Sequence, residues 1–143
     1  MDEFVPEFKC TLGEELLRPT RIYVKSIRQI LARYKVKKIV KAMAHITGSG
    51  LPGNLPRVLP AGFAARLKRD AWTPHPVFTW LQKNGPVDLE EMFNVFNMGI
   101  GFVLIVRPTF TKSIMSALRA LGEKPCFLGK VRKSGGEPSL EWS

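Results

Sequence analysis

The run Phe102–Val106 constrains the fold of this 143-residue chain most, because five apolar residues follow one another without a polar interruption. Gly101 precedes the run, Pro108 closes it, and its length is typical of a strand that is buried on both faces. A strand of this kind needs covering layers on both sides. With 45% hydrophobic residues, the chain has enough apolar material for one domain with a single sizeable core.

Segments that can form these layers are recognisable from their hydrophobic periodicity. The predicted helices are 22–34, 55–59, 76–83, one that starts with a capping box between Asp88 and Glu91, and 110–121; the predicted strands are 38–47, 63–68, 102–106 and 126–131, and the tail can add one more edge strand. Residues 1–10 lack periodicity and are expected to form an extended lead-in. This order predicts an α+β or layered α/β domain with one mixed sheet.

Two of these elements carry more detailed expectations. In the strand 38–47, the period of two places Val40, Ala42, Ala44 and Ile46 on one face. The strand 63–68 alternates apolar and basic residues and is therefore expected to be more exposed. Asn54 is expected to cap the helix 55–59.

The chain has 22 basic and 12 acidic residues, and its formal charge of +10 should attract polyanions or phosphorylated small molecules. The basic residues gather in three clusters, which are Lys35/Lys37/Lys38/Lys41, Arg66/Lys68/Arg69 and Lys130/Arg132/Lys133. No aromatic residue is interleaved in any of them, which does not favour nucleic acid as a partner. Solvated faces that keep the protein soluble explain most of these side chains.

The remaining composition excludes several classes of protein. Cys10 and Cys126 lie far apart and no signal-peptide pattern precedes them, which predicts a reducing, cytoplasmic location. No apolar stretch is long enough to cross a membrane. His45 and His75 are thirty residues apart and neither is near a cysteine, so we expect no metal bound by this chain alone and no nucleophilic triad.

The best candidate for chemistry is the stretch 45–54, HITGSGLPGN. Gly48 and Gly50 allow the main chain to turn its N–H groups toward an anion, and His45 and Thr47 leave the preceding strand on one face. A tight strand-to-helix turn with a buried His45 is the alternative. The residues alone favour that alternative, because a bare GxG matches no complete phosphate-binding fingerprint.

Two further stretches are similar in kind. Thr20 and Arg21 stand at a helix start and suit an anion, although a plain helix cap explains them nearly as well. Asn97 brings an amide to the mouth of the buried strand, where Gly99 and Gly101 follow; its alternative is a helix end with a close backbone approach.

Four blocks in order closely resemble one enzyme family. They are TLGEELLRPTRIYVK (11–25), AMAHITGSGLPGNLPRVLP (42–60), VFTWLQKNGPVDLEEMFNVFNMGIGFVLIV (77–106) and ALGEKPCFLGKV (120–131). Together they resemble the C-terminal half of the phosphoribosylformylglycinamidine cyclo-ligases, also called aminoimidazole ribonucleotide synthetases. The wording HITGxGLPxNLPRVLP and FNMGIG is specific to that family.

The resemblance implies a three-layer α/β/α domain over residues 11–143 and a role in purine biosynthesis. In the family, ATP activates the formamide oxygen of formylglycinamidine ribonucleotide as an iminophosphate, an internal nitrogen closes the imidazole ring, and phosphate leaves. The family's N-terminal half carries most contacts to ATP and magnesium, and the intact enzyme is a homodimer. This chain matches only the second half, so we expect it to hold no cofactor and to be inactive alone.

The resemblance also implies a set of residues that bind the phosphorylated ribonucleotide substrate, and it assigns none of them a catalytic role. They are Thr20, Arg21, His45, Thr47, Gly48, Ser49, Gly50, Asn54 and Asn97. Two positions depart from the family pattern, which usually has glycine at position 49 and glutamate at position 53. Two alternatives remain: a stand-alone basic module that binds RNA or another anion, and another ATP-dependent member of the superfamily such as selenophosphate synthetase.

Overall fold

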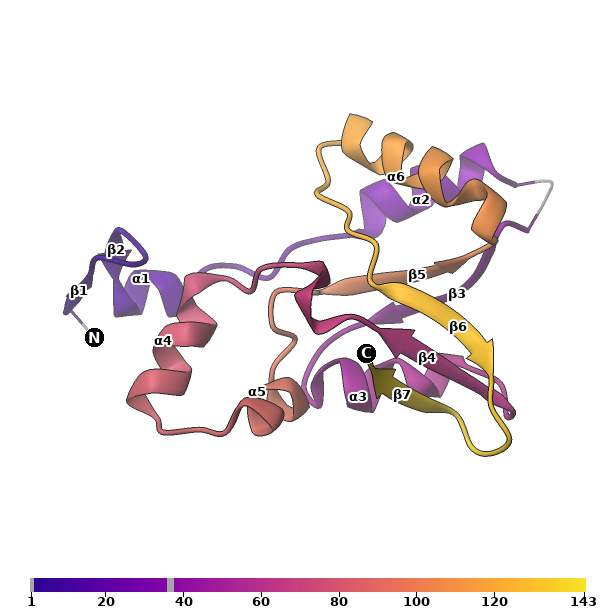
Figure 1. Cartoon of the computed structure of the whole chain (residues 1–143). Helices are drawn as coiled ribbons and strands as arrows, with labels where there is room; N and C mark the ends of the chain where they lie inside the picture. The colour runs from indigo at the N-terminus through magenta and orange to yellow at the C-terminus, as the bar shows by residue number, and fades with distance from the viewer. Residues whose placement is uncertain (1, 36–37) are drawn as a thin grey trace.

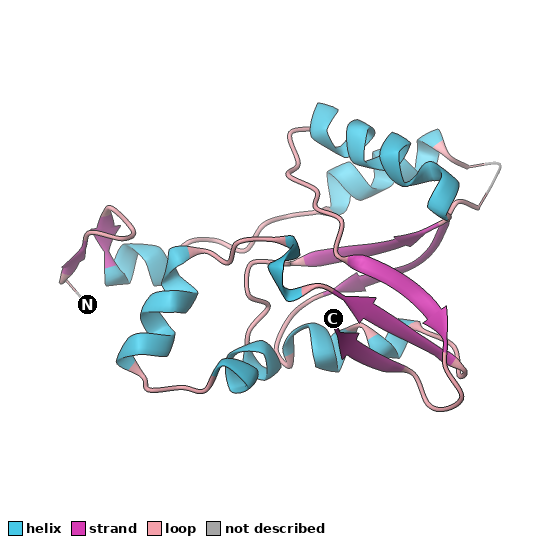
Figure 2. Cartoon of the chain, in the orientation of Figure 1, coloured by secondary structure: helices cyan, strands magenta, loops and turns pink. Residues whose placement is uncertain are grey.

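The computed structural model describes residues 2–35 and 38–143, so Met1 and Lys37, which belong to the expected lead-in and to a basic cluster, lie outside the described residues. The helices are α1 Leu12–Leu16, α2 Val24–Arg33, α3 Gly50–Asn54, α4 Pro76–Asn84, α5 Leu89–Val95 and α6 Thr111–Ala120, with short 3₁₀ helices η1 Pro56–Val58, η2 Arg69–Ala71 and η3 Pro108–Phe110. The strands are β1 Phe4–Val5, β2 Cys10–Thr11, β3 Val40–His45, β4 Phe63–Leu67, β5 Phe102–Val106, β6 Gly129–Lys133 and β7 Ser139–Trp142 (Figures 1 and 2).

The strands confirm the α+β class but do not form the single mixed sheet that we expected. β3 pairs with β5 in an antiparallel two-stranded sheet, and β1 pairs with β2 in a small hairpin. The mixed pairing is confined to a three-stranded sheet in which β4 lies between antiparallel β6 and parallel β7. The sequence pattern defines the faces of each strand, whereas long-range hydrogen bonds decide which strands are neighbours.

Helices α2 and α6 form a layer over one face of β3 and β5, and α3 lies on the other side of the strands (Figure 1). Ile30 of α2 and Ile114 and Ala117 of α6 are buried there with Ile39, which precedes β3. The hydroxyl groups of Tyr34 and Ser113 share a hydrogen bond between the two helices, with 2.5 Å between the oxygens. This layer confirms the amphipathic helices predicted near 22–34 and 110–121.

The faces of β3 differ from the expectation at its first residue. Val40 packs with the α2 and α6 side, whereas Ala44 and Ile46 belong to the opposite core, so the prediction that all four apolar residues share one face is wrong. The cause is a register shift between Val40 and Ala42, since a β-bulge rotates the chain by one residue and exchanges the two faces.

A second core fills the space between β3, β5, α3 and the three-stranded sheet. Its buried members are Ala44, Ile46, Leu51, Leu55, Leu59, Ala65, Leu67 and Val103. The expectation of a more exposed strand at 63–68 is wrong: β4 is the central strand of its sheet, and its apolar residues Ala65 and Leu67 are buried. Ala64 is buried as well, and Arg132 of β6 and Glu141 of β7 form an ion pair beside it.

The N-terminal residues form the β1–β2 hairpin and α1, which the sequence analysis overlooked. Thr11 caps α1: its hydroxyl accepts from the Glu14 N–H at 3.2 Å, and the Glu14 carboxylate accepts from the Thr11 N–H at 2.8 Å. That backbone hydrogen bond lowers the pKa of Glu14. The overlooked signal was the T-x-x-E spacing of a capping box. Phe8 of this segment meets Trp80 of α4 edge to face.

Helix α5 starts at the predicted place, but the predicted capping box between Asp88 and Glu91 is not formed: the Asp88 side chain caps the helix by accepting from the Glu90 N–H at 2.8 Å. Its buried residues Met92 and Phe93 form a third cluster with Met98, and Val87, just before the helix, packs against that cluster as in a hydrophobic staple. Arg69 of η2 packs against the outer side of this cluster. Its guanidinium lies 5.3 Å from the ring centre of Phe93 and 5.0 Å from that of Trp142, and it pairs with Glu90.

We predict that Arg69→Ala lowers the free energy of unfolding by about 1–2 kcal/mol, because it removes a forked ion pair and two ring contacts at once. Urea unfolding of the purified chain measures this change. Arg57→Ala is the matched control, since the Arg57 side chain is exposed on η1. Equal midpoints for the two variants would contradict the bracing role of Arg69.

Candidate functional site

Three stretches that are far apart in the sequence meet at one end of the β3–β5 pair. The Ile46 N–H donates to the Gly101 carbonyl at 2.9 Å, which joins the loop after β3 to the segment before β5. The Cα of Gly101 lies against the Tyr23 hydroxyl, so closely that a Cβ at this position would stand 2.0 Å from the oxygen. The expected candidates at 20–21, 45–54 and 97 are therefore brought to one region of the surface.

Three rings mark the centre of this region. His45 stacks on Phe102 with ring centres 6.1 Å apart, and Tyr23 meets His45 at 6.0 Å and Phe102 at 5.4 Å. His45 and Phe102 are cross-strand partners, which is why they share a face. The His45 side chain is exposed, so the alternative of a buried core histidine is wrong. Its imidazole packs against the Tyr23 and Phe102 rings and remains accessible to solvent.

Tyr23 and Glu123 are the residues of this region that the sequence analysis missed. Burial raises the pKa of the Tyr23 phenol, an effect that Glu123 reinforces and Arg21 opposes, so the hydroxyl is protonated at neutral pH. Tyr23 lies inside the predicted helix 22–34, where its hydrophobic spacing gives no sign of a role in a site. Glu123 lies in the last resembling block, but no local pattern connects it to residues a hundred positions earlier.

Both carboxylate oxygens of Glu123 hold the start of α2 and the residues just before it. One oxygen lies 2.7 Å from an Arg21 guanidinium nitrogen, and the other accepts from the Ser26 hydroxyl at 2.5 Å. Glu123 is itself anchored, because its N–H donates to the Leu118 carbonyl at the end of α6. Arg21 is thereby held beside Tyr23 with its side chain half exposed, and Thr20 is exposed next to it.

The loop after β3 has a compact internal structure. Ser49 is left-handed, with φ of 70°, and α3 begins directly after it at Gly50. The Gly50 N–H donates to the Thr47 carbonyl at 3.2 Å, so this N–H is used inside the loop. Gly50 also packs against α5, where a Cβ would stand 2.0 Å from the Phe93 carbonyl oxygen. Thr47, Gly48 and Ser49 are the exposed part.

Asn54 has a different role from the one expected. The prediction that it caps a helix at 55–59 is wrong, since it is the last residue of α3 and only the short η1 follows. Its amide nitrogen donates to the Gly48 carbonyl at 2.8 Å and to the Gly50 carbonyl at 2.7 Å, and the residue is 7% exposed. Asn54 thus shapes the loop from beneath while His45, Thr47 and Ser49 face outward.

Asn97 also stabilises its own segment. Its side-chain oxygen accepts from the Gly99 N–H at 2.8 Å, across a turn in which Met98 and Gly99 have positive φ. The Met98 carbonyl accepts from the Trp72 indole N–H at 2.8 Å, which fastens the turn to the third cluster. Asn97 is half-buried, one residue after Phe96, whose carbonyl lies against Gly50.

Other chemistry finds little support in the part of the chain that the structure describes. Residues 2–35 and 38–143 contain no group of three or more His, Cys, Asp or Glu side chains placed to hold a metal ion. None of their helices combines the length and apolar character that a membrane span requires. Both cysteines are free thiols, and burial raises the pKa of the Cys126 thiol, which agrees with a packing role.

Comparison with known proteins decides the family. The family described as "AIR synthase related protein, C-terminal domain" matches residues 2–140. The chain belongs to this family. Relatives named phosphoribosylformylglycinamidine cyclo-ligase from Bacillus subtilis and Geobacillus kaustophilus are 46% and 44% identical over 136 residues, which is 95% of this chain and 38% of their length.

A relative of the same name from Desulfitobacterium hafniense is 50% identical over 126 residues, 88% of this chain and 36% of its own length. The chain therefore spans little more than a third of the curated relatives it matches. The resemblance of the four sequence blocks to the C-terminal part of this enzyme is confirmed.

The structure connects the two positions at which the loop departs from the family pattern. A Cβ at Gly53 would stand 2.4 Å from the Ser49 Cβ and 3.4 Å from its Oγ, and no other contact lies within 4 Å. The Ser49 side chain therefore conflicts with any side chain at position 53. With glycine at position 49 that conflict disappears.

We predict that Gly53→Ala lowers the free energy of unfolding by about 1–3 kcal/mol through this overlap, and that adding Ser49→Gly restores most of the loss. Ser49→Gly alone should be tolerated, because glycine adopts a φ of 70° readily. Thermal unfolding of the wild type, both single variants and the double variant measures the coupling. Additive losses would refute it.

Proposed function

We propose that this chain is the substrate-side C-terminal domain of a phosphoribosylformylglycinamidine cyclo-ligase. The reaction would convert formylglycinamidine ribonucleotide and ATP to aminoimidazole ribonucleotide, ADP and phosphate. Relatives that share this name at 41–50% identity support the proposal and favour it over selenophosphate synthetase. The observation that carries it is the meeting of the Tyr23, His45 and Gly101 segments at one end of the β3–β5 pair.

In this proposal the exposed side chains of that region contact the phosphorylated ribonucleotide. Arg21 supplies a guanidinium that can form a bidentate ion pair with phosphate, and Thr47 and Ser49 supply hydroxyls from the loop. The His45 edge and the protonated Tyr23 hydroxyl lie between them. Asn54 and Asn97 maintain the shape of the two loops, because their side chains bond to backbone groups of their own segments.

ATP and magnesium belong, in this proposal, to an N-terminal half that pairs with this domain and forms a homodimer in the complete enzyme. The described residues contain no group of three or more His, Cys, Asp or Glu side chains placed to hold a metal ion, which is why the proposal assigns magnesium to the N-terminal half. This domain then binds and orients the ribonucleotide and excludes water from one side of it. The isolated chain is expected to be inactive.

The first test supplies the missing part. We expect no aminoimidazole ribonucleotide from this chain alone, and ATP-dependent product when it is mixed with the N-terminal part of the Bacillus subtilis relative. His45→Phe keeps the stacking on Phe102 and removes the ring nitrogens, so it should lower kcat/KM by roughly 10- to 100-fold. Full activity of His45→Phe would reduce His45 to a packing role; turnover by the chain alone would overturn the division of labour.

A second prediction concerns Arg21. Arg21→Gln should raise KM by about tenfold and leave kcat nearly unchanged, because a phosphate contact binds substrate and transition state alike. Steady-state kinetics of the reconstituted enzyme measures both constants. Arg18→Gln is the matched control, since Arg18 forms a similar half-exposed ion pair with Glu15 at 3.0 Å outside the site. Equal effects of the two substitutions would remove Arg21 from the proposed site.

A further inference from the structure

The positive charge of the chain is concentrated in one layer of the fold. We define the basic layer as residues 21–35, 38–41 and 107–124, which comprise α2, α6 and their flanking segments. It contains eleven basic residues and a single acid, Glu123. The basic members are Arg21, Lys25, Arg28, Arg33, Lys35, Lys38, Lys41, Arg107, Lys112, Arg119 and Lys124. The rest of the sequence is balanced, with eleven basic and eleven acidic residues.

The cations of the basic layer are free to meet a partner. All eleven are exposed. Within the described residues, the only ion pair among them joins Arg21 to Glu123, while Arg33 lies 5.9 Å from the Tyr34 ring centre. Figure 1 places α2 and α6 side by side on the face opposite α3 and α5, so the charge is segregated in space as well as in sequence.

Two of these cations stand where they weaken the fold. Lys25 is the second residue of α2 and Lys112 the second residue of α6, and neither helix has an acidic residue in its first turn. A helix N-terminus carries partial positive charge, so a lysine there is repelled and an acid is preferred. The requirements of folding therefore do not account for the cations at these positions.

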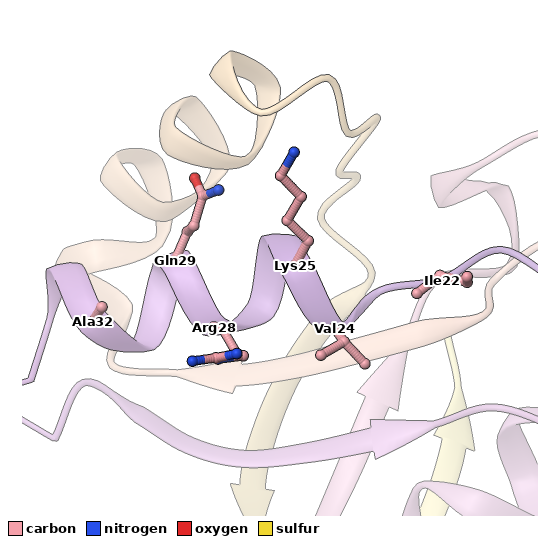
Figure 3. A pocket seen from close by; sticks show the side chains of 6 residues that line it. All are labelled: Ile22, Val24, Lys25, Arg28, Gln29 and Ala32. Carbon is pink, nitrogen blue, oxygen red and sulfur yellow. The ribbon is translucent and has the colours of Figure 1, made fainter.

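The cations are spread too widely for one small anion. The β3–β5 pair runs from His45 and Phe102, next to the loop, to Val40 and Val106 at the far end, a length of roughly 17–20 Å. Arg21 stands at the loop end, whereas Arg107 and Lys112 follow the far end of β5. Around the hollow on α2, Lys25 and Arg28 leave the helix in different directions (Figure 3).

This length and composition fit a nucleic-acid duplex that is held by its phosphates. A duplex carries one negative charge per about 1.7 Å, so it presents about ten phosphates over the length of the layer. A single strand would need stacking platforms, but the layer's aromatic residues are packed: Tyr23 on Phe102, and Tyr34 on Phe110. Six of the eleven cations are lysines, which protein–protein interfaces disfavour.

We propose that the basic layer is a sequence-independent binding surface for double-stranded nucleic acid. Taken singly in the sequence, the basic clusters do not favour such a partner. The fold changes this assessment, because it joins segments that are 66 or more residues apart into one layer that contains a single acid. Recognition through phosphates needs no aromatic residues and no defined pocket. Arg21 is shared with the proposed substrate site, whereas the other ten cations are not part of it, so binding to the layer does not depend on the proposed cyclisation.

The test measures binding of the full chain to fluorescein-labelled 20-base-pair RNA and DNA duplexes by anisotropy between 50 and 200 mM salt. We expect affinity to fall steeply with salt. Lys25→Glu/Lys112→Glu should weaken binding and reduce the salt slope by at least about two. Thermal unfolding should show this variant to be as stable as the wild type, because both acids stand at helix N-termini.

The matched control is Lys68→Glu/Lys130→Glu, which changes the net charge equally but lies on β6 and beside β4. This control should keep the wild-type salt slope. Equal weakening by both variants would show that only net charge matters and would overturn the proposal, as would no binding by the wild type. If polyglutamate displaced the labelled duplex as effectively as unlabelled duplex does, the surface would be assigned to an acidic polypeptide instead.

Two further outcomes separate the proposal from the substrate site. Displacement of the duplex by submillimolar ribose 5-phosphate would assign the cations to that site and overturn the proposal. Tighter binding of RNA than of DNA, or the reverse, identifies the preferred duplex, and equal binding supports recognition of phosphates alone. Because no N-terminal half is needed, the result does not depend on whether the cyclisation assay succeeds.

Discussion

The antiparallel pairing of β3 with β5 is the interaction on which the rest of the structure depends. The two strands are 57 or more residues apart in the chain, and the Ile46 N–H and the Arg107 N–H extend their ladder beyond both ends. One face of the pair anchors α2 and α6, and the other closes the core beneath. Loss of this pairing would therefore separate both cores and disperse the three segments of the candidate site.

Local patterns predicted much of the fold because they report on the burial of one element at a time. The helices near 22–34, 76–83 and 110–121 follow from hydrophobic period, and the strand at 102–106 follows from its uninterrupted apolar run. Which strands pair with each other does not follow from such local patterns. β4 is central because β7 pairs with it in parallel, and no residue of β4 indicates this pairing in the sequence. The bulge after Val40 is equally invisible to a strict period of two.

The candidate site was predictable as a set of segments rather than as a set of roles. The loop 45–54 and the turn at 97–101, both expected to hold substrate-binding residues, lie next to each other, yet the amides of Asn54 and Asn97 bind their own backbone. An amide that shapes a loop and an amide that contacts a ligand look alike in sequence. Glu123 escaped notice because its partners Arg21 and Ser26 lie about a hundred residues away, and only folding brings them together.

The overlap between Ser49 and a side chain at position 53 limits the order in which this loop can be changed. An acid cannot be placed at position 53 of this chain without a shift of the loop while Ser49 is present, because the two Cβ atoms would lie 2.4 Å apart. Replacement of Ser49 by glycine removes that contact first. Positions 49 and 53 therefore behave as one unit, and any redesign of the loop that adds a carboxylate has to treat them together.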